Sequence, residues 1–108
     1  MGYRVSFSID TGGEEPYFLE QSFGHTYNCV QMFREVLGKE GINSLDTMQA
    51  KDCILALENA IIYMELSPEK FKPMEPPNGW GTYETALDFL REILVMAKAH
   101  PKTTIHVS

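Results

Sequence analysis

Long apolar segments are missing from this sequence of 108 residues, in which no run reaches the length of roughly 18 apolar residues that a transmembrane helix needs. A signal-peptide pattern is also missing, because Met1 is followed at once by alternating polar and apolar residues. We therefore expect a cytoplasmic protein with no membrane partner.

Basic side chains are scarce as well, since 9 Lys and Arg stand against 15 Asp and Glu and the net charge is −6. A phosphate backbone attracts basic surfaces, so this excess of acid argues against direct binding of nucleic acid. One alternative stays open, an acidic inhibitor that mimics nucleic acid, which would need its carboxylates on one continuous face. The carboxylates concerned are Asp46, Asp52, Glu58, Glu65 and Glu69.

Only two cysteines are present, Cys29 and Cys53. They could form one disulfide at most, and a cytoplasmic chain is expected to keep them as thiols. We interpret both as small buried hydrophobic residues.

The overall composition is typical of one compact domain over residues 1–108. Hydrophobic residues make up 44% of the chain and charged residues 22%, which is the balance of a folded protein. A chain of this size can bury a core, although its stability margin is modest.

Period-two alternation marks the strands. Residues 3–9 alternate apolar and polar side chains, which predicts a strand with one buried face. Residues 17–23 are rich in aromatic side chains and predict a second strand, which Pro16 and Gly24 confine to a short edge piece. Residues 103–107 alternate again and predict a C-terminal strand.

Helical spacing predicts three helices, over residues 28–38, 46–66 and 83–99. The second would begin at Asp46, because its spacing to Gln49 resembles a capping box. Together these elements predict an α+β domain. Its small sheet would include the N- and C-terminal strands side by side and would be packed on one face by about three helices.

The only tryptophan, Trp80, stands between two glycines directly before the last predicted helix. Gly79 and Gly81 free the backbone to turn sharply on either side of it. Thr82 can cap the helix by accepting a hydrogen bond from an otherwise unpaired N–H.

Three short motifs mark the ends of the predicted helices: Thr26-Tyr27-Asn28, Gly41-Ile42 and Asn78-Gly79-Trp80-Gly81. In these motifs the chain resembles a group of small uncharacterised proteins encoded in phages and prophages, and the resemblance covers residues 26–107. It implies a cytoplasmic setting in a bacterial host cell and implies no activity. The resemblance also couples the loop of Thr26-Tyr27-Asn28 to the loop of Asn78-Gly79-Trp80-Gly81, two segments that composition alone would not connect.

Two patterns suggest chemistry. Asp10-Thr11-Gly12 resembles the triplet of retroviral-type aspartic proteases, but that triplet needs an all-β scaffold to bring two aspartates together. We interpret Asp10 as a turn residue that bonds local backbone N–H groups.

His25 and Cys29 stand four residues apart, which could place both on one helical face beside further Cys and His ligands. The other candidate ligands are Cys53, His100 and His106. No paired ligand motif accompanies them, and no third group orients a His–Cys nucleophile pair. We therefore predict no catalytic residue, no metal site and no cofactor, with a small hydrolase or metal-dependent enzyme as the alternative.

The remaining candidate is a binding surface made of aromatic and polar side chains from the two coupled loops. Its predicted members are His25, Thr26, Tyr27, Asn28, Asn78 and Trp80. Such amphipathic rings beside an amide and an imidazole suit a peptide or protein partner. A purely structural interpretation also stays open: Trp80 would fill a core gap, Asn28 would cap the first helix, and Tyr27 would pack beneath.

The sequence thus favours a non-enzymatic phage or prophage accessory or regulatory protein that acts by binding another protein, whose identity the motifs do not specify. We also expect a homodimer formed through the second helix. Its apolar stripe is widened onto neighbouring faces by Ile54, Leu55 and Ile62, which would leave a sticky patch on a small monomer.

Overall fold

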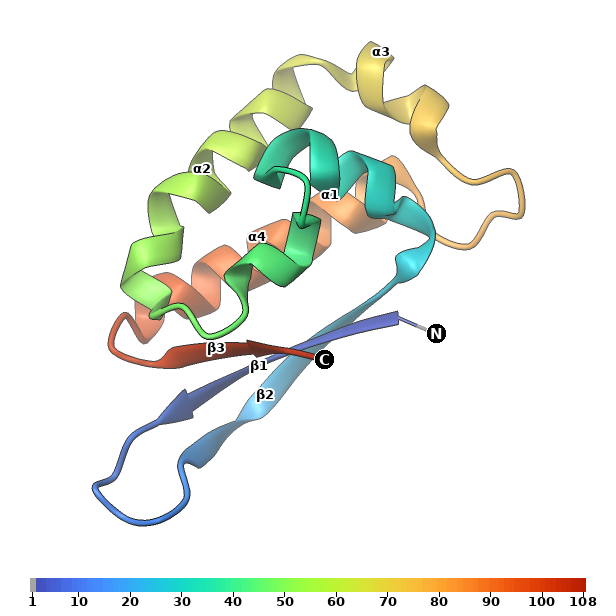
Figure 1. Ribbon diagram of the computed structural model, residues 1–108. Helices are drawn as coiled ribbons and strands as arrows, with labels where there is room; N and C mark the ends of the chain where they lie inside the picture. Colours follow the sequence, from blue (N-terminus) through green and yellow to red (C-terminus); the bar gives the residue numbers. More distant parts are fainter. Residues whose placement is uncertain (1) are drawn as a thin grey trace.

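The computed structural model describes residues 2–108 and has a three-stranded antiparallel sheet in the order β2-β1-β3 (Figure 1). Strand β1 spans Gly2–Ile9, β2 spans Tyr17–Thr26 and β3 spans Thr104–Val107. The N- and C-terminal strands are direct neighbours, with Phe7 opposite Ile105. The predicted α+β fold, with both terminal strands in one sheet, is confirmed.

The helices lie on one face of this sheet (Figure 1). Helix α1 spans Val30–Leu37, α2 spans Ala50–Leu66, α3 spans Pro68–Phe71 and α4 spans Tyr83–Ala99. Short 3-10 turns over Tyr27–Cys29, Gly41–Leu45 and Lys72–Met74 connect them. Within residues 2–108, no helix has the length and apolar character needed to cross a membrane.

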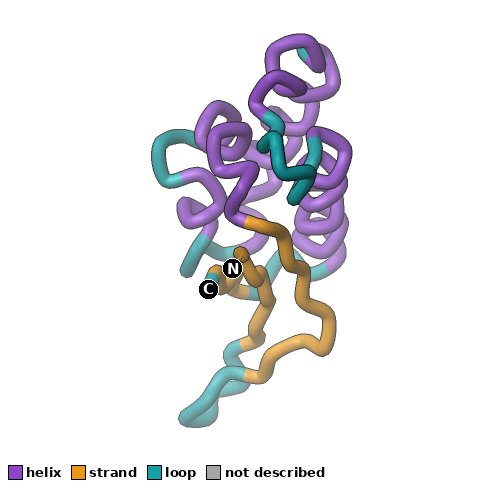
Figure 2. The backbone as a smooth tube through the Cα atoms, turned by 90° about the vertical axis from the view of Figure 1, so that its right-hand side faces the viewer, coloured by secondary structure: helices purple, strands orange, loops and turns teal. Residues whose placement is uncertain are grey.

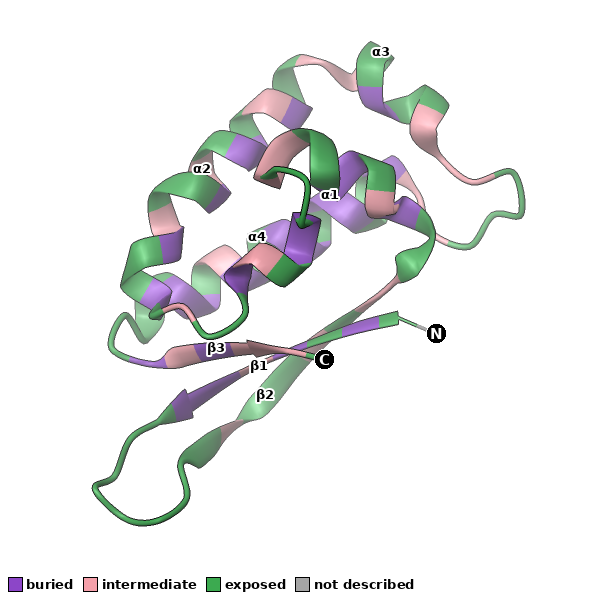
Figure 3. Ribbon diagram, in the orientation of Figure 1, coloured by how far each residue is buried: buried purple, intermediate pink, exposed green. Residues whose placement is uncertain are grey.

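The core lies between the sheet and the helices. Tyr3, Val5 and Phe7 of β1 are buried, and Ile105 of β3 is buried beside them. The helices contribute buried residues at helical spacing: Cys53, Leu57, Ala60, Ile61 and Met64 from α2, and Ala86, Leu87, Phe89, Leu90, Ile93, Met96 and Ala97 from α4. Leu94 was expected in this core as well, but it is only half-buried. In Figure 3, buried positions (purple) recur along α2 and α4 and on β1.

Ile9 was expected to be buried with the rest of β1, and this prediction is wrong. Its side chain is 40% exposed. The reason is visible in Figure 1, where the hairpin of β1 and β2 continues past the end of the helical layer, so the last residues of β1 have no helix above them.

The predicted start of the second helix at Asp46 is also wrong, because α2 begins at Ala50. The preceding residues bond to the C-terminal strand instead: the Thr47 N–H donates to the carbonyl oxygen of Ile105 at 2.8 Å. The Asp46 carboxylate accepts from the Val107 N–H at 2.9 Å and therefore pins β3 rather than capping a helix. Local capping chemistry was overridden by tertiary hydrogen bonds.

Strand β2 lies at the edge of the sheet, as predicted, but it continues to Thr26. Its pairing with β1 is regular from Gly2 opposite Thr26 to Ser6 opposite Ser22, and it then shifts before Ser8 opposite Phe18. Such a bulge twists an edge strand locally. The regular half of β2 therefore runs beside the body of the molecule, whereas the irregular half belongs to the projecting hairpin (Figure 2).

Candidate functional site

The two coupled loops meet at Gly81. A Cβ atom at this position would lie 2.7 Å from Cγ2 of Thr26 and 2.9 Å from Sγ of Cys29, distances that real Cβ atoms do not show. Gly81 also has a φ of 98°, which disfavours any residue with a side chain. The absent side chain therefore lets the tryptophan loop lie directly on the segment that carries Tyr27 and Asn28.

His25 supports the contact between the two loops. One ring nitrogen, Nδ1, is 2.9 Å from the carbonyl oxygen of Thr26, and the other, Nε2, is 3.0 Å from Oγ1 of Thr85. The imidazole stacks on Phe89 with a centroid distance of 5.3 Å and meets Phe33 edge-on at 5.4 Å. His25 thus joins the end of β2 to the first turn of α4.

The two aromatic members of the predicted surface are exposed. Trp80 is 68% exposed, so the interpretation that it fills a core gap is wrong. Tyr27 is 41% exposed, and its ring rests edge-on against Tyr3 with a centroid distance of 4.7 Å. One side of Tyr27 therefore packs against Tyr3, and the other side is exposed to solvent.

The amide and hydroxyl members hold the two loops in shape. Asn78 accepts a hydrogen bond from the Trp80 N–H at 2.9 Å, which closes a turn below the indole. Thr26, rather than Asn28, caps the turn at the start of the first helix, because its Oγ1 accepts from the Asn28 N–H at 3.3 Å. The Asn28 side chain is exposed and makes no hydrogen bond within residues 2–108.

The helix that follows is capped as predicted. Thr82 Oγ1 accepts from the Thr85 N–H at 3.1 Å, and Thr85 Oγ1 accepts from the Thr82 N–H at 2.8 Å. This reciprocal pair fixes the exit of the tryptophan loop at the first turn of α4. Trp80 is therefore two residues away from a rigid helix end.

Both cysteines are buried free thiols, as expected from the sequence. The Cys29 Sγ is 3.9 Å from the carbonyl oxygen of Thr82, and the Cys53 Sγ is 3.6 Å from that of Gln49. Burial raises the pKa of the Cys29 thiol and raises the pKa of the Cys53 thiol to about 11. Near neutral pH both stay protonated, which is unfavourable for a nucleophile or a metal ligand.

The other chemical candidates have structural roles or stand alone. The Asp10 carboxylate accepts from the Gly12 N–H at 2.9 Å, which confirms the interpretation as a turn residue. Within residues 2–108, no three His, Cys, Asp or Glu side chains are grouped so that they could hold a metal ion.

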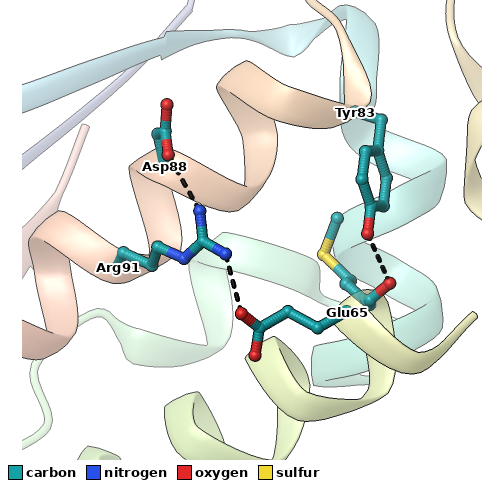
Figure 4. A network of polar contacts seen from close by, with 5 residues as sticks. Glu65, Tyr83, Asp88 and Arg91 are labelled. Atoms are coloured by element: carbon teal, nitrogen blue, oxygen red, sulfur yellow. Dashed lines mark hydrogen bonds and ion pairs between the residues drawn. The ribbon is translucent and has the colours of Figure 1, made fainter. Parts of the chain in front are cut away.

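The acidic residues of α2 do not form one uninterrupted negative face. Glu58 pairs with Lys98 at 3.0 Å, and Glu65 pairs with Arg91 at 2.8 Å. Arg91 also reaches Asp88 at 3.1 Å, so it lies between two carboxylates (Figure 4). These cations from α4 neutralise part of the charge that a nucleic-acid mimic would need to present.

A groove that the sequence did not predict lies between the edge of β2 and α4. It has two hollows that share Asp88 and Glu92 in their walls. The larger has a volume of about 340 Å³ and is mainly apolar, with Phe23, Val95 and Met96 in its lining. The smaller has a volume of about 250 Å³ and is about equally polar and apolar.

The lining residues of the smaller hollow are Gly24, His25, Thr85, Asp88, Phe89 and Glu92. The one signal in the sequence for this groove was Val95, an apolar residue on the outer side of an otherwise regular amphipathic helix.

Comparison of the chain with protein-family models, curated proteins and solved structures gave no significant match.

Proposed function

We propose that this protein is a non-enzymatic accessory or regulatory protein of a phage or prophage that acts by binding another protein. The observation that carries the proposal is the pair of exposed aromatic side chains, Trp80 and Tyr27, on two loops that pack against each other through Gly81. Exposed tryptophan and tyrosine are the residue types that dominate the energy of protein interfaces.

The rigidity of the two loops supports this proposal. The turn closed by Asn78, the caps made by Thr26 and Thr82, and the contact of Tyr27 with Tyr3 fix the backbone on both sides of the aromatic rings. Little backbone conformational entropy therefore remains to be lost when a partner covers these loops. A core role would have buried Trp80, whereas a loop with no binding role gains nothing from this exposed indole.

The phage or prophage setting rests on the sequence motifs alone. Two of the three motifs, Thr26-Tyr27-Asn28 and Asn78-Gly79-Trp80-Gly81, supply the segments that meet in the structure. Motifs that are far apart in the sequence can share one binding surface only if they lie close together in the structure.

We further propose that the protein forms a homodimer through α2. Leu55, Ile62 and Leu66 lie seven and four residues apart, so they share one side of the helix, and their exposed fractions are 68%, 52% and 76%. Three large exposed aliphatic side chains along one helix are a contact surface for a second copy.

The experiment that tests the binding function is affinity capture from infected or lysogenic bacterial cells, with the native protein and two variants as bait. Trp80→Ala and Tyr27→Ala should each lose most of the captured partner while the melting temperature changes little. Tyr17→Ala is the matched control, since Tyr17 is also an exposed aromatic residue but lies on the projecting hairpin. Equal capture by all four baits would refute a role for this aromatic surface.

A further inference from the structure

The free edge of β2 lies beside the two hollows described above, and together they form the β2–α4 groove. In residues 2–108, β1 is the only strand paired with β2, so the outer backbone N–H and C=O groups of β2 have no strand partner. Figure 2 shows β2 as the outermost strand below α4, and Figure 3 shows it as mostly exposed. A long edge strand with open backbone groups is a template for a further strand.

The regular part of this edge coincides with the groove. Residues Ser22 to Thr26 keep an uninterrupted register with β1, and the groove is lined by Phe23, Gly24 and His25 from the same stretch. Five residues of strand are about 17 Å long, enough for a short peptide to pair along its backbone.

The spacing of the hollows matches the side-chain period of a strand. Phe23 lines the apolar hollow and His25 lines the polar hollow, so the two hollows are offset by two residues of β2. In an added strand, residues i and i+2 point to the same side. One peptide side chain would therefore enter the apolar hollow while the second-next side chain enters the polar one.

The charge of the groove selects the chemistry of the second side chain. Asp88 and Glu92 line both hollows, and Arg91 is the cation among the lining residues. Arg91 is already shared between Asp88 and Glu65, whereas Glu92 takes part in no ion pair within residues 2–108. A Lys or Arg side chain of the partner would meet this open carboxylate.

A second copy of the same chain fits this site poorly. Strand β2 contains Glu20 and no lysine or arginine, so pairing of two β2 edges would bring further carboxylates to a rim that is already acidic. The exposed aliphatic surface for self-association lies on α2 instead. The charge of the groove thus favours a basic segment from a different protein.

We propose that the β2–α4 groove binds an extended peptide segment of the partner by strand addition, with a large apolar side chain at one position and Lys or Arg two residues away. This inference rests on the proposed protein-binding function and adds the chemistry of the partner segment.

The test uses an array of ten-residue peptides that carry Leu or Phe two residues before or after Lys or Arg, and a matched array with Asp in place of the basic residue. Basic peptides should bind, and the Asp peptides should not. Raising the salt concentration should weaken binding, because part of the attraction is between charges near the surface. Amide hydrogen exchange of the complex should show new protection at alternating residues between Ser22 and Thr26.

Three variants test whether the peptides bind in the β2–α4 groove. Val95→Glu, at a position that is 69% exposed and can accept a charge without loss of fold, should abolish binding by placing a carboxylate in the apolar hollow. Glu92→Lys should lower the affinity for basic peptides by about threefold to tenfold. Glu69→Lys makes the same charge change on α3, outside the groove, and should leave the affinity unchanged.

Three results would overturn the inference: no binding by any array member, equal binding of basic and acidic peptides, or binding without protection in β2. The proposed function, which rests on the aromatic surface, can fail independently of the β2–α4 groove. If no peptide binds but Trp80→Ala and Tyr27→Ala still lose the cellular partner, only the groove is wrong. If peptides bind as described but those two variants capture the partner normally, only the aromatic surface is wrong.

Discussion

The Tyr83 hydroxyl donates a hydrogen bond of 2.6 Å to the carbonyl oxygen of Met64, so the first residue of α4 is tied to the last turn of α2 (Figure 4). Carbonyl groups in the last turn of a helix lack their usual partner four residues on, and the buried Met64 carbonyl accepts only a longer bond of 3.3 Å from the Ser67 N–H besides this one. The phenol therefore gives this buried acceptor a second and shorter hydrogen bond, and it also anchors the helix that follows the tryptophan loop.

Replacing Tyr83 with Phe should lower the free energy of unfolding by about 1 kcal/mol, because the buried Met64 carbonyl loses the shorter of its two hydrogen bonds and keeps only the one from the Ser67 N–H. Urea denaturation followed by circular dichroism measures the difference. Tyr17→Phe is the control, since Tyr17 is 57% exposed and its hydroxyl can bond to water. Equal stability of Tyr83→Phe and the native protein would show that this bond contributes nothing net.

Gly81→Ala should destabilise the protein by about 2 kcal/mol more than Gly79→Ala. Both glycines have positive φ angles, 98° and 75°, so both variants pay a similar backbone cost. Only at position 81 does the added methyl group meet Thr26 and Cys29, whereas position 79 has nothing within 4 Å. Thermal denaturation of the two variants side by side isolates the steric part. Equal melting temperatures would mean that the two loops separate readily.

The Cys53 thiol predicts how stability depends on alkaline pH. Its pKa is raised by burial from 9.0 to about 11, so the unfolded chain releases this proton at lower pH than the folded protein does. The associated stability is complete below pH 9 and is lost as the pH rises through 11, by about 3 kcal/mol in total. Cys53→Ala should be less stable near neutral pH because of lost packing, and its stability curve should fall less steeply over this window. Parallel curves would contradict the burial of the thiol.

Removal of residues 102–108 should abolish cooperative unfolding. The truncation deletes β3, whose Ile105 is fully buried and whose backbone bonds both β1 and the segment before α2. Analytical size exclusion and a melting curve measure the result. Removal of Ser108 alone is the milder control, since it costs only the two backbone bonds with Arg4. Unchanged melting of the long truncation would show that the final segment is dispensable.

Self-association should depend on the exposed side of α2. Leu55→Glu together with Ile62→Glu should convert a dimer into a monomer in light scattering, because two carboxylates would be buried without partners at the contact. Ala56→Glu, a change at an exposed position about 100° round the same helix from Leu55, should leave the dimer intact. A native protein that is monomeric at high concentration would refute the dimer outright.

Local patterns predicted those parts of the fold that local interactions decide. The boundaries of α4 follow from the Thr82 cap and the apolar spacing after it, and both are as expected. The alternation of residues 3–7 and 103–107 correctly predicted two strands that share a core. Asp46 was misassigned because its carboxylate bonds a backbone N–H that is distant in the sequence, at Val107, and no local pattern contains that information.

In the candidate site, too, local patterns predicted some features, whereas tertiary contacts decided the others. The sequence indicated the tryptophan loop and the segment of Tyr27 separately, and the motifs suggested that they belong together. The contact itself depends on the missing side chain of Gly81. The β2–α4 groove was not predicted, because Phe23 and Val95 become neighbours only through the packing of a strand edge against a helix.

The hairpin that projects beyond the helices has a consequence for proteolysis. Its tip, residues 10–16, is exposed throughout and lies outside the core. A protease that cuts there would sever the chain between β1 and β2, yet β1 would still be held by its pairing with β2 on one side and β3 on the other. A cleaved molecule should therefore migrate as one particle in native gels and as two fragments only after denaturation.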